Sequence, residues 1–175
     1  MASVVAIWVA NRRTFLYGAP RARRIRGPVQ GGSAGMTDRE RAHRDAMRTD
    51  IASIAERLQD VLGQRLTAYA VGVRDPRSIG RYAKGPHAEG GQTPRDDTNN
   101  RLRQLYQIVQ MLVAQETSET VRAWFLGANP LLEDRSPIEL LHEDDNFPVE
   151  RTAAADTRPG YFSVVTAAED FVEST

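Results

Sequence analysis

Two apolar stripes constrain the fold of this chain more than any other feature. One lies in residues 38–63 and the other in residues 98–115, and in both the apolar residues recur at the 3.6-residue period of an α-helix. The first stripe contains Ile51, Ile54, Ala55, Leu58, Val61 and Leu62, and the second contains Leu102, Leu105, Ile108, Val109, Leu112 and Val113. We therefore predict an all-α protein in which these helices bury their stripes. The second stripe is either intramolecular core or, in part, the seam of a homodimer.

Two shorter helices are predicted between the stripes, at residues 65–71 and 76–84. Gly72 lies between them and can adopt the left-handed conformation of a tight turn. Asp75 can cap the second of these helices, and Pro76 suits its first position. Two short helices joined by such a turn have the layout of a helix-turn-helix, whose second helix enters the major groove of DNA. We therefore expect residues 36–90 to form a DNA-binding domain.

The charges of the chain support this expectation. The 23 basic and 23 acidic residues give a net charge of zero, but residues 64–85 are strongly basic and Asp75 is their only carboxylate. Neutralisation of phosphates dominates the affinity of proteins for DNA, so a basic island suits this role. We expect base or groove contacts from Arg74, Arg77, Ser78 and Arg81, and a phosphate contact from Lys84.

Residues 1–35 are rich in arginine, contain no carboxylate and end in a Gly-rich stretch at 27–35. The pair Arg12-Arg13 lacks the long apolar segment that an export signal needs, and the run Val4–Val9 is too short to span a bilayer. We expect a cytoplasmic protein with a disordered basic extension and no membrane partner. The extension either precedes a natural start at Met36 or is an arm that contacts DNA phosphates.

A second motif occupies residues 119–141. A helix at 119–126 is followed by a break at Asn129-Pro130, and Ser136, Pro137 and Glu139 form a capping box that opens a new helix. We expect five side chains of this region to bury against the long helix, namely Trp124, Leu131, Ile138, Leu140 and Leu141. A further helix is predicted at residues 147–156.

This succession resembles the toxin-binding domain of Xre/MbcA/ParS-type bacterial antitoxins, in which a tryptophan, an Asn-Pro-type turn, a glycine-rich link, a proline and a double leucine follow one another. The matching residues are Trp124, Asn129, Pro130, Pro137, Leu140 and Leu141, whereas residues 132–135 replace the glycines. The resemblance covers about residues 50–157. It implies an all-helical antitoxin in which an Xre-like helix-turn-helix precedes a small helical domain, residues 97–157, that binds the toxin or dimerises. It also implies a RES-domain toxin that depletes NAD, and repression of the antitoxin's own operon.

Residues 158–175 form an unusually apolar tail. A hinge-like Arg158-Pro159-Gly160 precedes a short terminal helix, for which Thr166 and Glu169 form a predicted capping box. Such a tail docks either on its own domain or on the toxin, and the resemblance implies a C-terminal extension that enters the toxin's active-site cleft. There the acidic residues would pair with arginines of the toxin. The expected toxin contacts are Trp124, Asn129, Pro130, Tyr161, Phe162, Glu169, Asp170, Phe171, Val172 and Glu173.

The sequence offers no apparatus for catalysis. The chain has no cysteine, and its three histidines show none of the close spacings that bind a metal. We therefore expect no enzyme activity, no metal site and no cofactor. The primary hypothesis is an antitoxin of a type II system that neutralises a RES-type toxin, represses its own operon through operator DNA, and forms a homodimer or a hetero-oligomer with the toxin. The alternative is a stand-alone helix-turn-helix transcription regulator.

Overall fold

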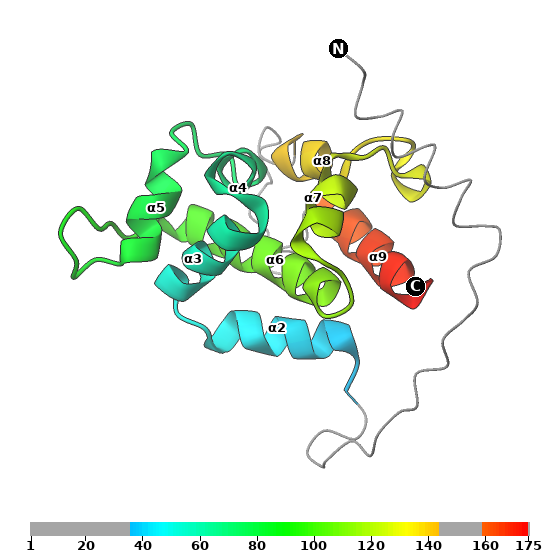
Figure 1. Ribbon diagram of the computed structural model, residues 1–175, viewed down its shortest axis with the longest axis horizontal. Coiled ribbons are helices and arrows are strands. Elements are labelled where there is room, and N and C mark those ends of the chain that lie inside the picture. Colours follow the sequence, from blue (N-terminus) through cyan, green and yellow to red (C-terminus); the bar gives the residue numbers. More distant parts are fainter. Residues whose placement is uncertain (1–35, 144–158, 175) are drawn as a thin grey trace. The chain divides into compact units, whose positions relative to one another are not determined.

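The computed structural model describes residues 36–143 and 159–174, so the basic extension at 1–35 and the helix expected at 147–156 lie outside the described residues. The described residues form eight α-helices and one 3₁₀ turn, without any strand (Figure 1). This confirms the all-α class. Within the same ranges, no helix combines the length and the apolar character needed to cross a membrane.

The elements follow one another along the chain with short connections. They are α2 (Asp38–Arg48), α3 (Ile51–Leu62), α4 (Gln64–Ala70), α5 (Arg77–Lys84), α6 (Asp96–Val113), α7 (Ser118–Leu126), η1 (Pro130–Leu132), α8 (Pro137–Glu143) and α9 (Pro159–Glu173). The ends of α4 to α7 lie close to the predicted ones.

The prediction of one continuous helix over residues 38–63 was wrong, because Asp50 separates α2 from α3. Its backbone is extended, and its Oδ1 accepts hydrogen bonds from the N–H groups of Ala52, at 3.1 Å, and Ser53, at 3.0 Å. The Ser53 hydroxyl donates to Oδ2 at 2.6 Å. A side chain that satisfies the first free N–H groups of a helix marks its start. The break allows α2 to pack on α6 while α3 packs on α5, α6 and α7.

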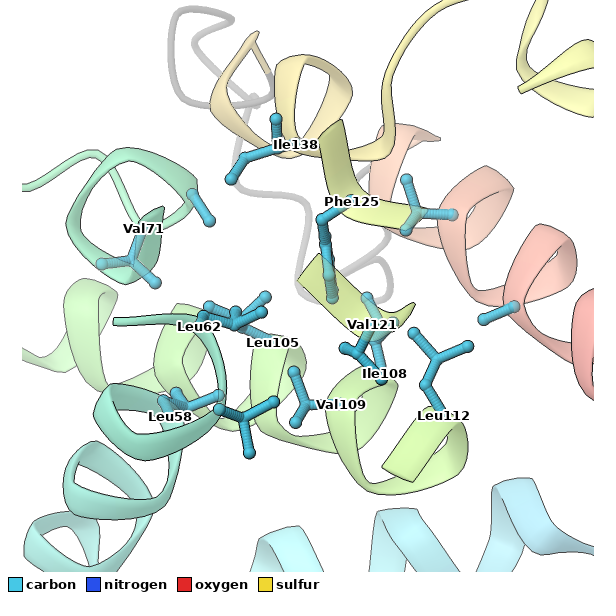
Figure 2. Close-up of a cluster of buried hydrophobic side chains, with 14 of the residues drawn as sticks. Leu58, Leu62, Val71, Leu105, Ile108, Val109, Leu112, Val121, Phe125 and Ile138 are labelled. Carbon is cyan, nitrogen blue, oxygen red and sulfur yellow. The ribbon is translucent and has the colours of Figure 1, made fainter. Parts of the chain in front are cut away.

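The core is built around α6. Its stripe is buried from Leu102 to Leu112, and α2, α3, α7 and α9 all contact it. Figure 2 shows side chains from α3, α6, α7 and α8 meeting in this core, with Leu58, Ile108 and Phe125 among them. The stripe is therefore intramolecular core. The described parts of the two regions expected as domains, residues 38–90 and 97–143, contribute to one buried cluster.

Arginine side chains of α6 and α7 cap the C-terminal ends of α2 and α3. Arg103 on α6 donates to the carbonyls of Ala46 and Thr49 at the end of α2, the latter at 2.9 Å. Arg122 on α7 donates to the carbonyls of Asp60 and Val61 at the end of α3, the former at 3.0 Å. The last carbonyls of a helix have no partner within it, and a cation there also interacts favourably with the helix dipole. These long-range contacts fix the directions of α2 and α3.

The terminal helix is longer than predicted. It begins at Pro159, and Thr166 is an exposed residue in its interior, so the capping box at Thr166 and the hinge-like role of Pro159-Gly160 were both wrong. Proline suits the first helical position because its missing N–H has no partner there anyway. The buried row Tyr161, Val164, Val165 and Ala168 then explains why the helix continues, since this row packs on α6, α8 and η1.

We predict that Asp50→Ala lowers the free energy of unfolding by about 1 kcal/mol at neutral pH, because α3 loses its N-cap. Hydrogen bonds from the Ser53 side chain, then from its backbone, hold the pKa of Asp50 below its ordinary value of 3.8. Since the folded pKa is depressed, this stabilisation is present above about pH 4 and disappears as pH falls through the folded pKa.

Denaturant unfolding at several pH values measures both effects. Asp50→Asn is the control, because an amide oxygen still caps the helix but does not titrate. An alanine variant as stable as the parent at pH 7 would contradict the capping role.

Candidate nucleic-acid and protein interfaces

The first candidate surface is formed by α4, the turn at 71–76 and α5. Gly72 has φ 68°, as expected, and the Val73 N–H bonds to the Ala68 carbonyl at 2.8 Å, which closes α4 with a glycine cap. Ala68 is buried where the helices meet, and Ile79 fixes α5 in the core. The pair therefore has a defined geometry, held from below by α3.

The outer side of α5 is basic. Arg74, Arg77, Arg81 and Lys84 are all exposed, so the four predicted cations lie at the surface of the α4–α5 pair. Such a group can bind phosphates, because each side chain keeps N–H donors and a charge in water.

Ser78 does not share this exposure. It is 8% exposed, and its hydroxyl accepts a hydrogen bond from Arg81 Nη2 at 2.7 Å. The same nitrogen lies 3.0 Å from Asp75 Oδ2. Ser78 and Asp75 therefore orient Arg81, and sequence reasoning placed Ser78 at the surface because it could not see which side of α5 faces α3. An exposed ion pair of this kind contributes little stability, so a phosphate can replace Asp75 as the partner of Arg81.

The loop after α5 is fixed by glycine. A Cβ on Gly91 would lie 1.7 Å from the Gly85 carbonyl oxygen, which only glycine allows. The Gln92 N–H bonds to the Arg81 carbonyl at 3.0 Å, so the loop returns to the end of α5. Sequence reasoning missed this contact, for which Gly90-Gly91 was the available signal.

The second candidate surface is the loop between α7 and α8, organised by Asn129. Its Oδ1 accepts from the Leu131 N–H at 2.9 Å, its carbonyl accepts from the N–H groups of Leu132 and Asp134, and its N–H donates to the Arg135 carbonyl at 3.1 Å. Leu131, expected to be buried, is 58% exposed, and Leu132 is buried in its place. Neighbouring residues of a 3₁₀ helix point in different directions, because the helix has three residues per turn. Only one of the two leucines of η1 can therefore face the core.

Two residues of this loop have left-handed backbone. Glu133 has φ 57° and Asp134 has φ 60°, in the region that favours glycine. They occupy the segment in which the sequence resemblance predicts glycines.

One of the two bonds of the predicted capping box of α8 is present. The Ser136 N–H donates to Glu139 Oε2 at 3.2 Å, and hydrogen bonds from the Ser136 side chain, then its backbone, hold the pKa of Glu139 below its usual range. Pro137 is the first residue of α8, and Ile138 is buried while Leu140 and Leu141 are partly buried.

The predicted toxin contacts divide into buried and accessible residues. Trp124 is 3% exposed, and Tyr161 is buried with its hydroxyl donating to Gln107 Oε1 at 2.8 Å. Burial raises the pKa of Tyr161 to about 12. The accessible predicted residues are Asn129, Pro130, Phe162, Glu169, Asp170, Phe171, Val172 and Glu173, several of them only in part. In the free chain the tail folds back on its own body.

Sequence reasoning missed two histidine contacts. His43 Nδ1 lies 3.2 Å from Gln107 Oε1, beside Tyr161, and the His142 ring stacks on Tyr69 at 4.0 Å while its Nδ1 donates to the Tyr69 carbonyl. Both histidines therefore join separate helices. Over residues 36–143 and 159–174, no group of three potential metal ligands is brought together.

No protein-family model, no curated protein and no solved structure matches this chain.

We predict that Glu133→Gly raises the free energy of unfolding by about 1 kcal/mol, because glycine adopts left-handed backbone without the clash of a Cβ atom. Thermal unfolding measures the change. Glu133→Ala is the control, since it removes the same exposed carboxylate and keeps the Cβ. Equal melting temperatures for the two variants would contradict the assignment of strain to Glu133.

Proposed function

We propose that this protein is an antitoxin of a type II toxin–antitoxin system, a binding protein without enzyme activity. It neutralises a RES-type toxin that depletes NAD and represses its own operon in the cytoplasm. The observation that most supports this function is the loop between α7 and α8.

In Xre/MbcA/ParS-type domains a glycine-rich link follows the turn after the tryptophan helix. Here Glu133 and Asp134 adopt the backbone conformation that glycine favours, although neither is glycine. The residues around them keep the expected order, with Trp124 before the loop, Asn129-Pro130 at its start, and Pro137 at the first position of α8. The left-handed backbone of Glu133 and Asp134 supports the resemblance to this domain, although the residues themselves differ from the expected glycines.

The DNA-binding part of the proposal rests on α4 and α5. We assign them as a helix-turn-helix in which α5 enters the major groove, because Gly72 forms the turn and Arg74, Arg77, Arg81 and Lys84 are exposed together. The surface would bind operator DNA mainly through phosphates, with Arg77 and Arg81 nearest the bases.

The toxin-binding part of the proposal involves the exposed loop and α9. Leu126 and Leu131 are 50% and 58% exposed on either side of Asn129, and the hydrogen bonds of Asn129 hold this loop rigid. Rigid apolar residues are effective anchors because little conformational entropy is lost when they bind. The acidic end of α9, with Glu169, Asp170 and Glu173, would meet arginines of the toxin.

A stand-alone transcription regulator is the second candidate. It is favoured by the packing of α9 on its own body, since a tail that already has a binding site needs no toxin.

We expect a tagged copy of the protein, purified gently from its native host, to retain a stoichiometric RES-type partner. That partner should arrest growth and lower cellular NAD when expressed alone, and do neither when co-expressed with this chain. Recovery of the protein with DNA but without any partner would favour the stand-alone regulator.

We expect the double variant Arg77→Ala with Arg81→Ala to bind operator DNA more weakly and with a salt dependence about two units shallower in log–log slope, because two phosphate or base contacts are lost. Electrophoretic mobility shift or fluorescence anisotropy at several salt concentrations measures this. Arg44→Ala with Arg48→Ala on α2 is the matched control, since both arginines are exposed but lie on another helix. Equal losses in the two double variants would refute the assignment of α5 to the groove.

A further inference from the structure

The indole N–H of Trp124 is an exception in the core. Its side chain is 3% exposed, and its Nε1 atom has no hydrogen-bond partner among the described residues. Buried donors in folded proteins are nearly always paired, because an unpaired one loses its bond to water and gains nothing. The packing around Trp124 therefore excludes solvent but supplies no hydrogen-bond acceptor for the indole N–H.

Helix α9 contributes to this burial. The Phe171 ring lies against Trp124 with 6.2 Å between ring centroids. Near its N-terminus α9 is attached by the Tyr161–Gln107 hydrogen bond, and in its C-terminal half by an ion pair of 3.4 Å between Glu169 and Arg39. The apolar row of α9 packs between these points on α6, α8 and η1.

The apolar row of α9 is completely buried in the middle of the helix and only partly buried in its last turn. Val164, Val165 and Ala168 are fully buried, whereas Phe171 and Val172, which continue the same row, remain partly exposed. Phe162, on another side of the helix, is 38% exposed. Helices of this length are marginal alone in water, so α9 gains its helical order from the surface on which it lies. A helix with a loosely held end opens more readily than the core does.

We infer that the surface beneath α9 is a protein-docking surface that α9 covers in the free chain, and that a partner's helix of the same chemistry replaces it. We call this the Trp124 surface, and define it by Trp124, Gln107, Arg39 and the parts of α6, α8 and η1 that α9 contacts. The partner helix presents an apolar row at helical spacing and a carboxylate that pairs with Arg39. This rests on the proposed function, in which the released α9 binds the toxin.

The chemistry expected of the partner helix follows from that of α9, because α9 covers the Trp124 surface in the free chain. Arg39 sets the charge that the partner must supply, because its partner Glu169 leaves with α9. The unpaired N–H of Trp124 gives an incoming helix a bond that α9 does not make, and such a bond can raise affinity about tenfold over a helix without an acceptor there. A tenfold difference in affinity is enough for a partner helix to displace a similar helix such as α9.

The opening of α9 can be measured in the full chain without any partner. In a Trp8→Phe background the remaining indole N–H is that of Trp124, and its proton exchange is followed by ¹⁵N NMR beside the backbone amides. We expect the indole to exchange together with the amides of α9 and at least tenfold faster than those of α6. Phe171→Ala should accelerate both the indole and α9, again by about tenfold or more.

Phe162→Ala is the matched control, because it removes an aromatic ring from α9 away from Trp124 and should leave the indole exchange unchanged. If the indole exchanges only as slowly as the amides of α6, in the parent and in Phe171→Ala alike, α9 is a permanent part of the core and the inference is overturned.

Docking is tested with a labelled synthetic peptide of residues 159–174 as the probe. We expect saturable binding to full-length Phe171→Ala, and binding at least tenfold weaker to the parent, whose own α9 competes. A matched peptide carrying Glu169→Gln should bind more weakly than the native peptide, since it lacks the carboxylate for Arg39. Fast indole exchange without any peptide binding would refute the docking surface.

These outcomes are independent of the toxin. A chain that opens and binds the peptide but retains no toxin in the host would refute the antitoxin function and keep the docking surface. A chain that neutralises a toxin while α9 never opens would support the antitoxin function and refute the docking surface.

Discussion

Burial of the apolar stripe of α6 is the interaction on which the rest of the structure depends. Leu102, Leu105, Ile108, Val109 and Leu112 are almost completely removed from solvent, and each such side chain contributes about 1.5–3 kcal/mol when buried. Because α2, α3, α7 and α9 all pack on α6, the position of each of these four helices depends on it. The α4–α5 pair reaches this core through α3 and is therefore oriented by it.

The short helices depend on this core for more than hydrophobic burial. Helices as short as α4, α5 and α8 do not form alone in water, so each needs tertiary contacts and satisfied ends. Asp50 and Glu139 supply caps that are local in sequence, whereas Arg103 and Arg122 supply theirs from helices far along the chain. The backbone of α5 is positioned by the burial of Ile79 and Tyr82 and by its packing on α3, which gives its exposed cations defined starting points along the helix.

The two candidate interfaces differ in how ready they are to bind. The cations of α5 and the leucines beside Asn129 are exposed in the free chain, whereas Trp124 and much of α9 cover one another. An antitoxin that binds operator DNA in one state and toxin in another would use this difference. DNA binding would need no rearrangement, and full use of Trp124 and α9 would require α9 to leave its own body.

The sequence by itself determined the helical class, the turn at Gly72, the Ser136–Glu139 contact at the start of α8 and the exposed cations, because these follow from period, turn chemistry and charge within a few residues. It did not determine that Asp50 separates α2 from α3, nor which of Leu131 and Leu132 is buried. Only the tertiary structure decided that Ser78 faces inward, that α9 begins at Pro159, and that Trp124 lies beneath it. Those outcomes depend on contacts between residues far apart in the chain, and the free energy of such contacts cannot be derived from a local sequence pattern.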